Sequence, residues 1–133
     1  MNKRKPRGEL AIRMLAMPAN TNPNGQIFGG WVVSHMDLAG LNVALKYTQS
    51  SHRVVTVAIA SMTFVQPVFV GDFICCYADL VKTGRTSMTI NIETWAIGPQ
   101  DKERRLVTEG EFVYVAIDDN GKPVAVNSVY SNS

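Results

Sequence analysis

Hydrophobic and polar positions follow two different patterns along this chain, and the change falls near Ser50. After it, apolar and β-branched residues alternate with polar ones in four runs, which span residues 53–68, 72–84, 86–98 and 105–118. Alternation of this kind is typical of strands, and the separators "VGD", "KTGR" and "GPQDKE" suit hairpin turns. The second half of the chain is therefore predicted to form a sheet of long antiparallel strands.

The first half of the chain predicts one long helix, over about residues 30–48. This segment contains no proline, and it follows a turn-rich stretch, residues 18–30, in which asparagine, proline and glycine recur. Residues 9–17, "ELAIRMLAM", fit a strand and helical turns equally well. One long apolar helix with four or five antiparallel strands predicts an α+β protein whose curved sheet wraps the helix.

Composition places the chain among globular proteins. It has 133 residues, of which 46% are hydrophobic and 18% are charged, and its net charge is +2. We expect one domain over residues 8–123, with flexible ends at 1–7 and 124–133. A basic cluster lies in the first seven residues and is expected to be solvated. The other basic residues are scattered, and no apolar run reaches the roughly 18 residues of a membrane span. We therefore expect neither nucleic-acid binding nor stable membrane association.

The cysteines, Cys75 and Cys76, are neighbours in a predicted strand. Adjacent strand residues point to opposite faces of a sheet, so these two thiols are not expected to pair or to form a metal site. Buried, reduced thiols are typical of a cytoplasmic protein.

Asp37 is the position in the predicted helix that most needs an explanation. On a helical wheel His35 belongs to a polar stripe with Ala39, Asn42 and Lys46, whereas Asp37 lies on the far side, among apolar residues. A structural interpretation pairs it with a buried arginine, Arg13 or Arg53. A functional interpretation makes it a general base, because burial raises the pKa of carboxylates toward the range that such a base needs. The pattern alone leaves both open.

The diglycine Gly29-Gly30, at the start of the predicted helix, supplies a complementary feature. The first amides of a helix have no intrahelical acceptor and lie at the positive end of its dipole. Glycine allows a carbonyl group to approach such amides closely. This arrangement suits an oxyanion, although a diglycine by itself is also a common turn.

With these residues in view, the sequence resembles the hot-dog-fold acyl-CoA thioesterases, and within them the YciA-like enzymes. The segment "NTNPNGQIFGGWVVSHMDLAG" is similar to the family's "N-x-x-G-x-x-F-G-G" loop followed by "M-D-x-x-G" in the helix. "RVVTVAIASMTFVQPVFVGD", "KTGRTSMTINIETW" and "FVYVAIDDNGKP" continue the resemblance. It covers the chain from about Glu9 to Pro123.

The resemblance implies a hydrolase of lipid metabolism that converts acyl-CoA to CoA and a free acid. Asp37 corresponds to the family's catalytic carboxylate and Asn22 to its loop asparagine. The resemblance also implies a homodimer with active sites at the interface, assembled further into a trimer of dimers, a homohexamer. Asp37 would activate water or attack the thioester, Gly29 and Gly30 would bind the carbonyl oxygen, and Asn22 would act from the neighbouring protomer. No metal or cofactor is expected.

CoA carries phosphates, and the sequence has no Gly-rich phosphate loop, so scattered groups must bind them. The residues expected to contact CoA are Arg53, Thr56, Lys82, Gly84, Arg85, Thr86 and Ser87. A non-catalytic acyl-CoA-binding protein of the same fold is the alternative. A hot-dog dehydratase is a weaker one, because the His of the dehydratase loop is missing.

Overall fold

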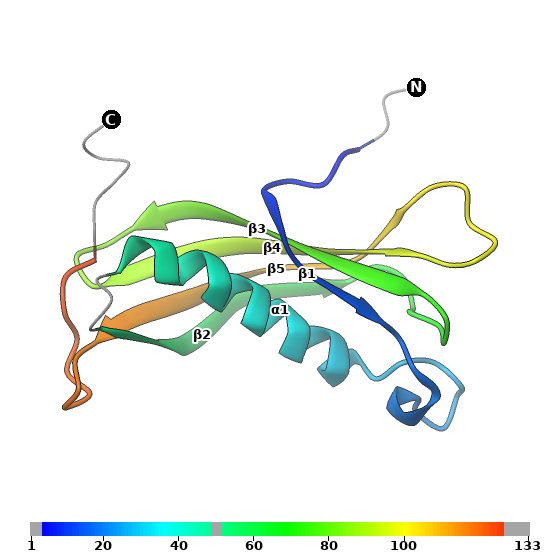
Figure 1. Cartoon of the computed structure of the whole chain (residues 1–133), viewed down its shortest axis with the longest axis horizontal. Helices are drawn as coiled ribbons and strands as arrows, with labels where there is room; N and C mark the ends of the chain where they lie inside the picture. The colour runs from blue at the N-terminus through cyan, green and yellow to red at the C-terminus, as the bar shows by residue number, and fades with distance from the viewer. Residues whose placement is uncertain (1–3, 49–51, 127–133) are drawn as a thin grey trace.

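The fold is one five-stranded antiparallel sheet with a single long helix across one of its faces (Figure 1). The computed structural model describes residues 4–48 and 52–126. Strand order is β1-β3-β4-β5-β2, and each neighbouring pair is antiparallel. The elements are β1 (Glu9–Leu15), η1 (Pro18–Asn20), α1 (Gly29–Ala44), η2 (Leu45–Tyr47), β2 (Arg53–Phe64), β3 (Phe73–Thr83), β4 (Ser87–Ile97) and β5 (Arg105–Ile117). The predicted fold class is confirmed.

The predicted elements are present with small differences at their ends. The helix begins at Gly29 and gives way after Ala44 to the short 3₁₀ turn η2, within the predicted span. The ambiguous segment at 9–17 is a strand, because β1 pairs along β3 and its backbone groups are satisfied there. Local pattern could not show this, since the partner strand lies more than fifty residues away in sequence.

The core lies between α1 and the sheet. The helix buries one stripe of residues against it: Val32, Met36, Ala39, Gly40, Val43 and Ala44. Ala39, which the helical wheel placed in the polar stripe, is fully buried, and Asp37 lies at the edge of the buried stripe, partly buried. The wheel was wrong because α1 is apolar on more than one side: Leu38 and Leu45 are about half exposed. Hydrophobicity alone therefore could not fix the rotation of the helix.

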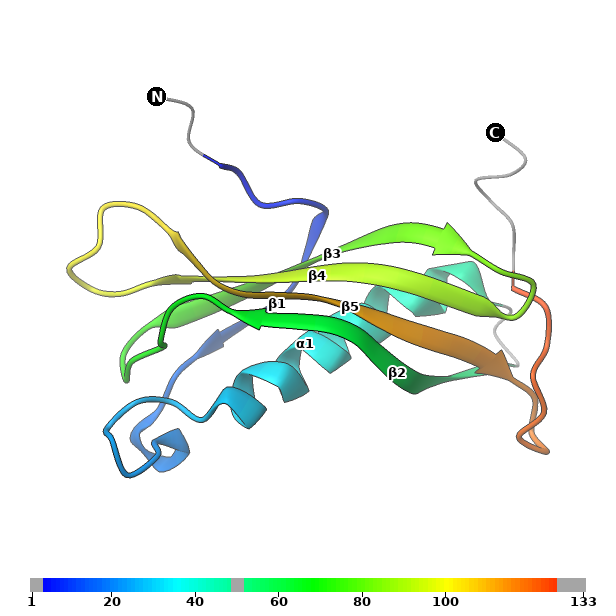
Figure 2. The same cartoon turned by 180° about the vertical axis from the view of Figure 1, so that it is seen from behind.

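The sheet face away from α1, which is turned toward the viewer in Figure 2, carries charged side chains. Arg4 forms ion pairs with Glu93 and Glu109, both at 2.7 Å, and Arg7 pairs with Asp79 at 2.6 Å. The Glu93 carboxylate also accepts hydrogen bonds from the Arg7 amide and from Trp95 Nε1. Arg4 and Arg7 thus lie against an acidic surface, with their side chains still about half exposed to solvent.

The domain bounds expected at 8 and 123 stay a prediction, and ordered contacts are also present outside them. Val126 is buried in the core, and its amide donates to Arg85 O at 2.9 Å. The expectation for residues 1–3 and 127–133 lies outside the described residues. Within the described ranges, no helix combines the length and apolar content that crossing a membrane requires.

Both cysteines are buried free thiols, as expected. Cys76 faces the core, where its Sγ lies 3.3 Å from Thr94 Oγ1. Burial raises the pKa of the Cys76 thiol to about 11, so this thiol is protonated at neutral pH.

Candidate active site

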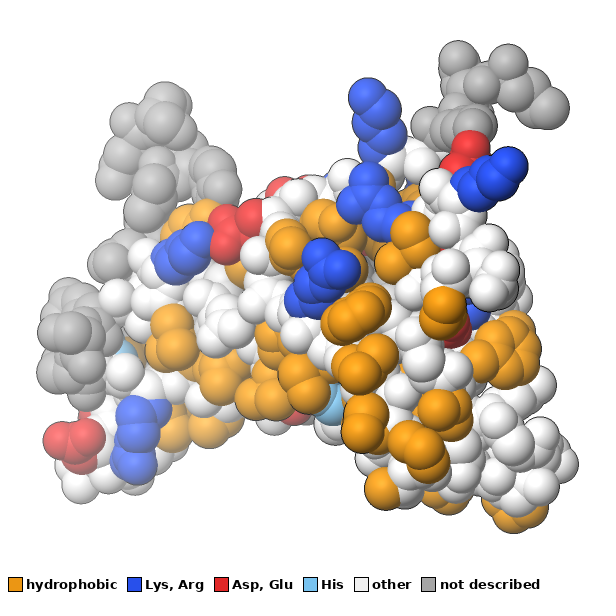
Figure 3. Space-filling model, turned by 45° about the vertical axis from the view of Figure 1, so that its right-hand side comes forward, with side chains coloured by type: hydrophobic (Ala, Val, Ile, Leu, Met, Phe, Trp, Pro, Cys, Tyr) orange, Lys and Arg blue, Asp and Glu red, His pale blue; other side chains and the backbone are white. Residues whose placement is uncertain are grey.

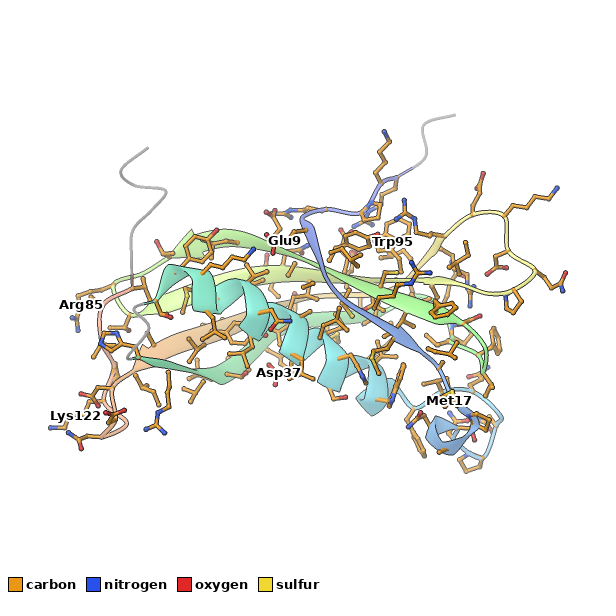
Figure 4. The ribbon with its side chains drawn as sticks, viewed as in Figure 1. Glu9, Met17, Asp37, Arg85, Trp95 and Lys122 are labelled. Carbon is orange, nitrogen blue, oxygen red and sulfur yellow. The ribbon has the colours of Figure 1, made fainter. Side chains whose placement is uncertain are left out.

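Asp37 lies in the middle of α1 (Figure 4), and two hydroxyl groups contact it. Thr56 Oγ1, on β2, donates to Asp37 Oδ1 at 2.6 Å. Tyr114 Oη, on β5, lies 2.8 Å from the main-chain oxygen of Asp37 and 3.2 Å from the same Oδ1. Within the described residues, Oδ2 accepts no hydrogen bond. The carboxylate is therefore fixed through one oxygen and has the other available.

Neither arginine of the structural interpretation pairs with this carboxylate. The Arg13 guanidinium lies 4.8 Å from the centre of the Phe73 ring, and Arg53 donates to Asp119 O. An ordinary ion pair therefore does not explain Asp37.

The N-terminus of α1 is open. Phe28 is the N-cap, and no side chain caps this end of the helix. A Cβ added to Gly30 would meet no atom within 4 Å, and the backbone there needs no positive φ. Nothing within the described chain therefore requires glycine at position 30. The space that a side chain at this position would fill is free for a ligand or a second chain.

Asn22 has a structural role in the loop before α1. Its Oδ1 accepts hydrogen bonds from the amides of Asn24 and Gln26, at 2.9 and 3.1 Å. These bonds leave the side-chain NH₂ group as its available donor. Asn22 and Gly29 line one cavity of about 380 Å³, together with Gln26, Ile27, Val32, Phe64, Val65, Gln66, Pro67, Val68 and Thr108. The loop asparagine and the helix N-terminus thus share a site.

Asp37 is not part of that cavity. Eight residues separate it from Gly29 along α1, which is roughly 12 Å at the rise of an α-helix. A thioester carbonyl within hydrogen-bonding distance of the Gly29 or Gly30 amide cannot also contact Asp37 of the same chain. The roles expected of the diglycine and Asp37 stay predictions, and this distance favours their coming from different protomers.

The residues expected to contact CoA come from two segments of the chain. Arg53 lies at the start of β2, and residues 82–87 form the end of β3, the turn to β4 and its first residue. The register brings these together at one end of the sheet, since Arg53 pairs with Ile117 and Ser87 with Val115. Arg85, in the turn, lies at the opposite end of the molecule from Met17, with Asp37 between them (Figure 4).

Two expected CoA contacts have internal partners. The Gly84 amide donates to Ser87 O, and Thr86 O accepts from the Ala116 amide. Thr56 lies three residues beyond Arg53 on β2, and its hydroxyl bonds to Asp37. The side chains of Arg53, Lys82 and Arg85 are exposed there.

Sequence reasoning missed Tyr114. The residue is fully buried on β5, and burial, reinforced by the charge of Asp37, raises the pKa of its hydroxyl, which therefore stays protonated. A signal existed in the alternation of run 105–118, which places Tyr114 on the same face as Phe112 and Ala116. Nothing in that alternation showed that its hydroxyl would reach Asp37.

Comparison with known proteins identifies the family. Residues 24–102 match the thioesterase superfamily. The chain is 51% identical over 121 residues to the acyl-CoA thioester hydrolase YciA of Salmonella typhimurium, covering 89% of this chain and 90% of that protein. A hexameric thioesterase from Yersinia pestis superposes with a TM-score of 0.86 at 52% identity, covering 94% of this chain and all of that one.

A third similar structure is an aspartate-to-alanine variant of a hexameric broad-specificity acyl-coenzyme A thioesterase. It superposes with a TM-score of 0.86 at 42% identity, covering 92% of this chain and 89% of that one. These likenesses extend over nearly the whole chain, so they include the strands, the helix and the loop of the candidate site.

Proposed function

The chain belongs to the thioesterase superfamily, and from this membership we propose that it hydrolyses acyl-CoA thioesters to CoA and a free acid. Its relatives include acyl-CoA thioester hydrolases at about half identity over nine-tenths of the chain. The single observation that carries the proposal is Asp37, a carboxylate fixed through Oδ1 with Oδ2 available. Such a group activates water as a general base or attacks the thioester carbon as a nucleophile.

We place each active site between two protomers. The roughly 12 Å between Gly29 and Asp37 along one helix supports a site completed by a second chain. β2 is an edge strand, and in the described chain ten of its twelve residues are exposed. Val55, Val57 and Ile59 are exposed there by 39%, 55% and 46%. An exposed, apolar edge of this length is suited to pairing with a second strand.

Twofold pairing along β2 brings the two halves of the site together. In an antiparallel pair, the Phe64 end of the partner's β2 lies toward the Arg53 half of this strand. Phe64 lies beside Gly29 in the cavity at the helix N-terminus, and the Arg53 half contains Thr56, which bonds to Asp37. The helix N-terminus of one protomer thereby approaches Asp37 of the other.

In this arrangement one protomer supplies the oxyanion site and its partner the carboxylate. The free amides of Gly29 and Gly30 stabilise the developing negative charge on the carbonyl oxygen, and the Asn22 NH₂ group orients the thioester or the water. Oxygen-18 from labelled water distinguishes the two roles of Asp37. In a single turnover the label enters the carboxylate only if Asp37 is the nucleophile.

The CoA phosphates are proposed to bind near the exposed side chains of Arg53, Lys82 and Arg85, with the hydroxyl groups of Thr86 and Ser87 supplying further donors. Reaction at Asp37 and Gly30 needs no metal or cofactor. Location in the cytoplasm, indicated by the free cysteines, stays a prediction.

Assembly of three such dimers into a hexamer is proposed from the hexameric relatives. A further apolar surface is available for it. Met17, Phe28 and Phe69 are each about half exposed, and hydrophobic side chains gather at the end of the molecule where α1 begins (Figure 3).

The test is thiol release from a series of acyl-CoAs of increasing chain length, with the wild type and Asp37→Asn. We expect the wild type to turn over and the variant, which keeps its size and its hydroxyl contacts, to lose at least about a hundredfold in kcat. Binding of acyl-CoA without release would indicate the non-catalytic alternative. A variant with wild-type kcat would show that Asp37 is structural.

A further inference from the structure

The hydroxyl of Tyr114 is the contact to Asp37 that comes from the core. The ring is fully buried on β5 and stacks on Phe112, with ring centres 6.4 Å apart and planes inclined by 15°. The ring therefore has little freedom to turn, and its hydroxyl has a fixed position against α1.

This hydroxyl reaches both the backbone and the side chain of Asp37. Oη lies 2.8 Å from the main-chain oxygen and 3.2 Å from Oδ1. One proton is shared between these two acceptors. Because the two acceptors belong to one residue, the contact fixes the side chain relative to its own backbone, and hence its rotamer. Thr56 supports the same Oδ1 from the edge strand, so both contacts leave Oδ2 as the unoccupied oxygen.

Gly40 shows that the helix is adapted to this contact. A Cβ at position 40 would overlap Tyr114 Oη, and it would lie 2.6 Å from Tyr114 Cζ and 2.7 Å from Ile92 Cδ1. Glycine is unfavourable inside a helix relative to alanine. Its φ here is not positive, so backbone conformation does not require it. The requirement is space, and the first group that needs this space is the Tyr114 hydroxyl.

We propose that Tyr114 is a positioning residue, which holds Asp37 in one rotamer and thereby makes Oδ2 the oxygen that reacts. The lack of a side chain at Gly40 leaves the space that this contact needs. The inference rests on the proposed function and adds to it a buried residue that acts through Asp37 without touching substrate. Since burial raises the pKa of the tyrosine, its hydroxyl is a donor throughout the neutral range.

The first test compares Tyr114→Phe with Tyr77→Phe in the thiol-release assay. Tyr77 also has a bonded hydroxyl, which accepts from Arg104 Nη1, but it lies on the opposite face of the sheet. Y114F keeps the ring and loses only the contact to Asp37. We expect its kcat to fall about tenfold, the loss of one hydrogen bond to a charged group, with KM changed less than about twofold. Y77F is expected to keep wild-type kcat.

The second test places Y114F in the D37N background. If Tyr114 acts through Asp37, the double variant is no slower than D37N alone, because the group that Tyr114 positions is already disabled. A purely structural role for the hydroxyl would instead lower both backgrounds equally. Gly40→Ala disturbs the same contact from the helix side, because its methyl group displaces the Tyr114 hydroxyl. We expect it to lower kcat as Y114F does.

The outcomes separate the two proposals. A wild type that releases no thiol refutes the proposed hydrolysis. If the wild type is active and Y114F leaves kcat unchanged, or lowers it equally in the wild-type and D37N backgrounds, the role of Tyr114 is overturned and the proposed hydrolysis stands. A Y114F chain that no longer folds would show that the hydroxyl serves the core, and would overturn it too.

Discussion

Complementation between two inactive variants tests whether the active site is shared between protomers. Gly30→Val places a β-branched side chain over the helix N-terminus, where a Cβ meets no atom of its own chain, so we expect the variant to fold. Loss of one oxyanion donor costs about 3 kcal/mol of transition-state stabilisation, or on the order of a hundredfold in kcat. Asp37→Asn disables the other half of the site. Each homodimer therefore has two defective sites.

Mixed dimers recover activity only if the halves come from different chains. In such a dimer, Asp37 of the G30V chain faces Gly30 of the D37N chain, and this site is intact. The second site carries both defects. Equal amounts of the two chains, fully exchanged, give half mixed dimers, so about a quarter of the wild-type sites and of the wild-type kcat should return.

The assay is thiol release before and after subunit exchange, with exchange verified by native mass spectrometry of one isotopically heavy chain. Each variant exchanged with itself is the control. The result depends on the roughly 12 Å between Gly29 and Asp37 along α1, which no side-chain rotation removes. Activity that stays at the level of the single variants after complete exchange would place both residues in one chain's site and refute the reasoning.

Three further predictions follow from the loop, the edge strand and the outer face. Asn22→Asp keeps the Oδ1 acceptor for the Asn24 and Gln26 amides but loses the NH₂ donor, so kcat should fall about tenfold without a change in Tm; an unchanged kcat would limit Asn22 to the loop. Val57→Asp, which places a charge on the exposed β2 edge, should yield inactive monomers by size-exclusion chromatography, whereas Val81→Asp on the inner strand β3 should stay assembled. Burial opposes ionisation of Glu93, but its bonds to Trp95, the Arg7 amide and Arg4 outweigh burial and lower its pKa. This stabilisation is present above the unfolded pKa of about 4.3 and is lost as the pH falls through the lower folded value. The free energy of unfolding, measured by denaturant titration between about pH 5 and 2, should therefore fall less steeply with pH in Glu93→Gln than in the wild type.

The sequence predicted the elements because their signals are local. Alternation marks the strands 53–64, 73–83, 87–97 and 105–117 within a few residues, and the absence of proline marks the helix. The segment at 9–15 lacked such a signal, because its strand conformation depends on pairing with β3. The ion pairs of Arg4 and Arg7 were not predicted for the same reason, since their partners Glu93 and Asp79 lie far along the chain.

The site shows the same limit at atomic scale. Asp37 and Gly30 were recognisable because a carboxylate in an apolar helix and a diglycine at its start are both unusual. Their spacing in the sequence already bears on the site, because eight residues of helix, roughly 12 Å, separate the two groups by more than one carbonyl group can span. That spacing does not give the rotation of α1 about its axis, which decides which strands supply the contacts of Asp37. Thr56 and Tyr114 meet at this carboxylate only because β2 and β5 are neighbours in the sheet, where they pair with each other. A site built from a helix and two strands therefore depends on strand order, which no single segment of the sequence expresses.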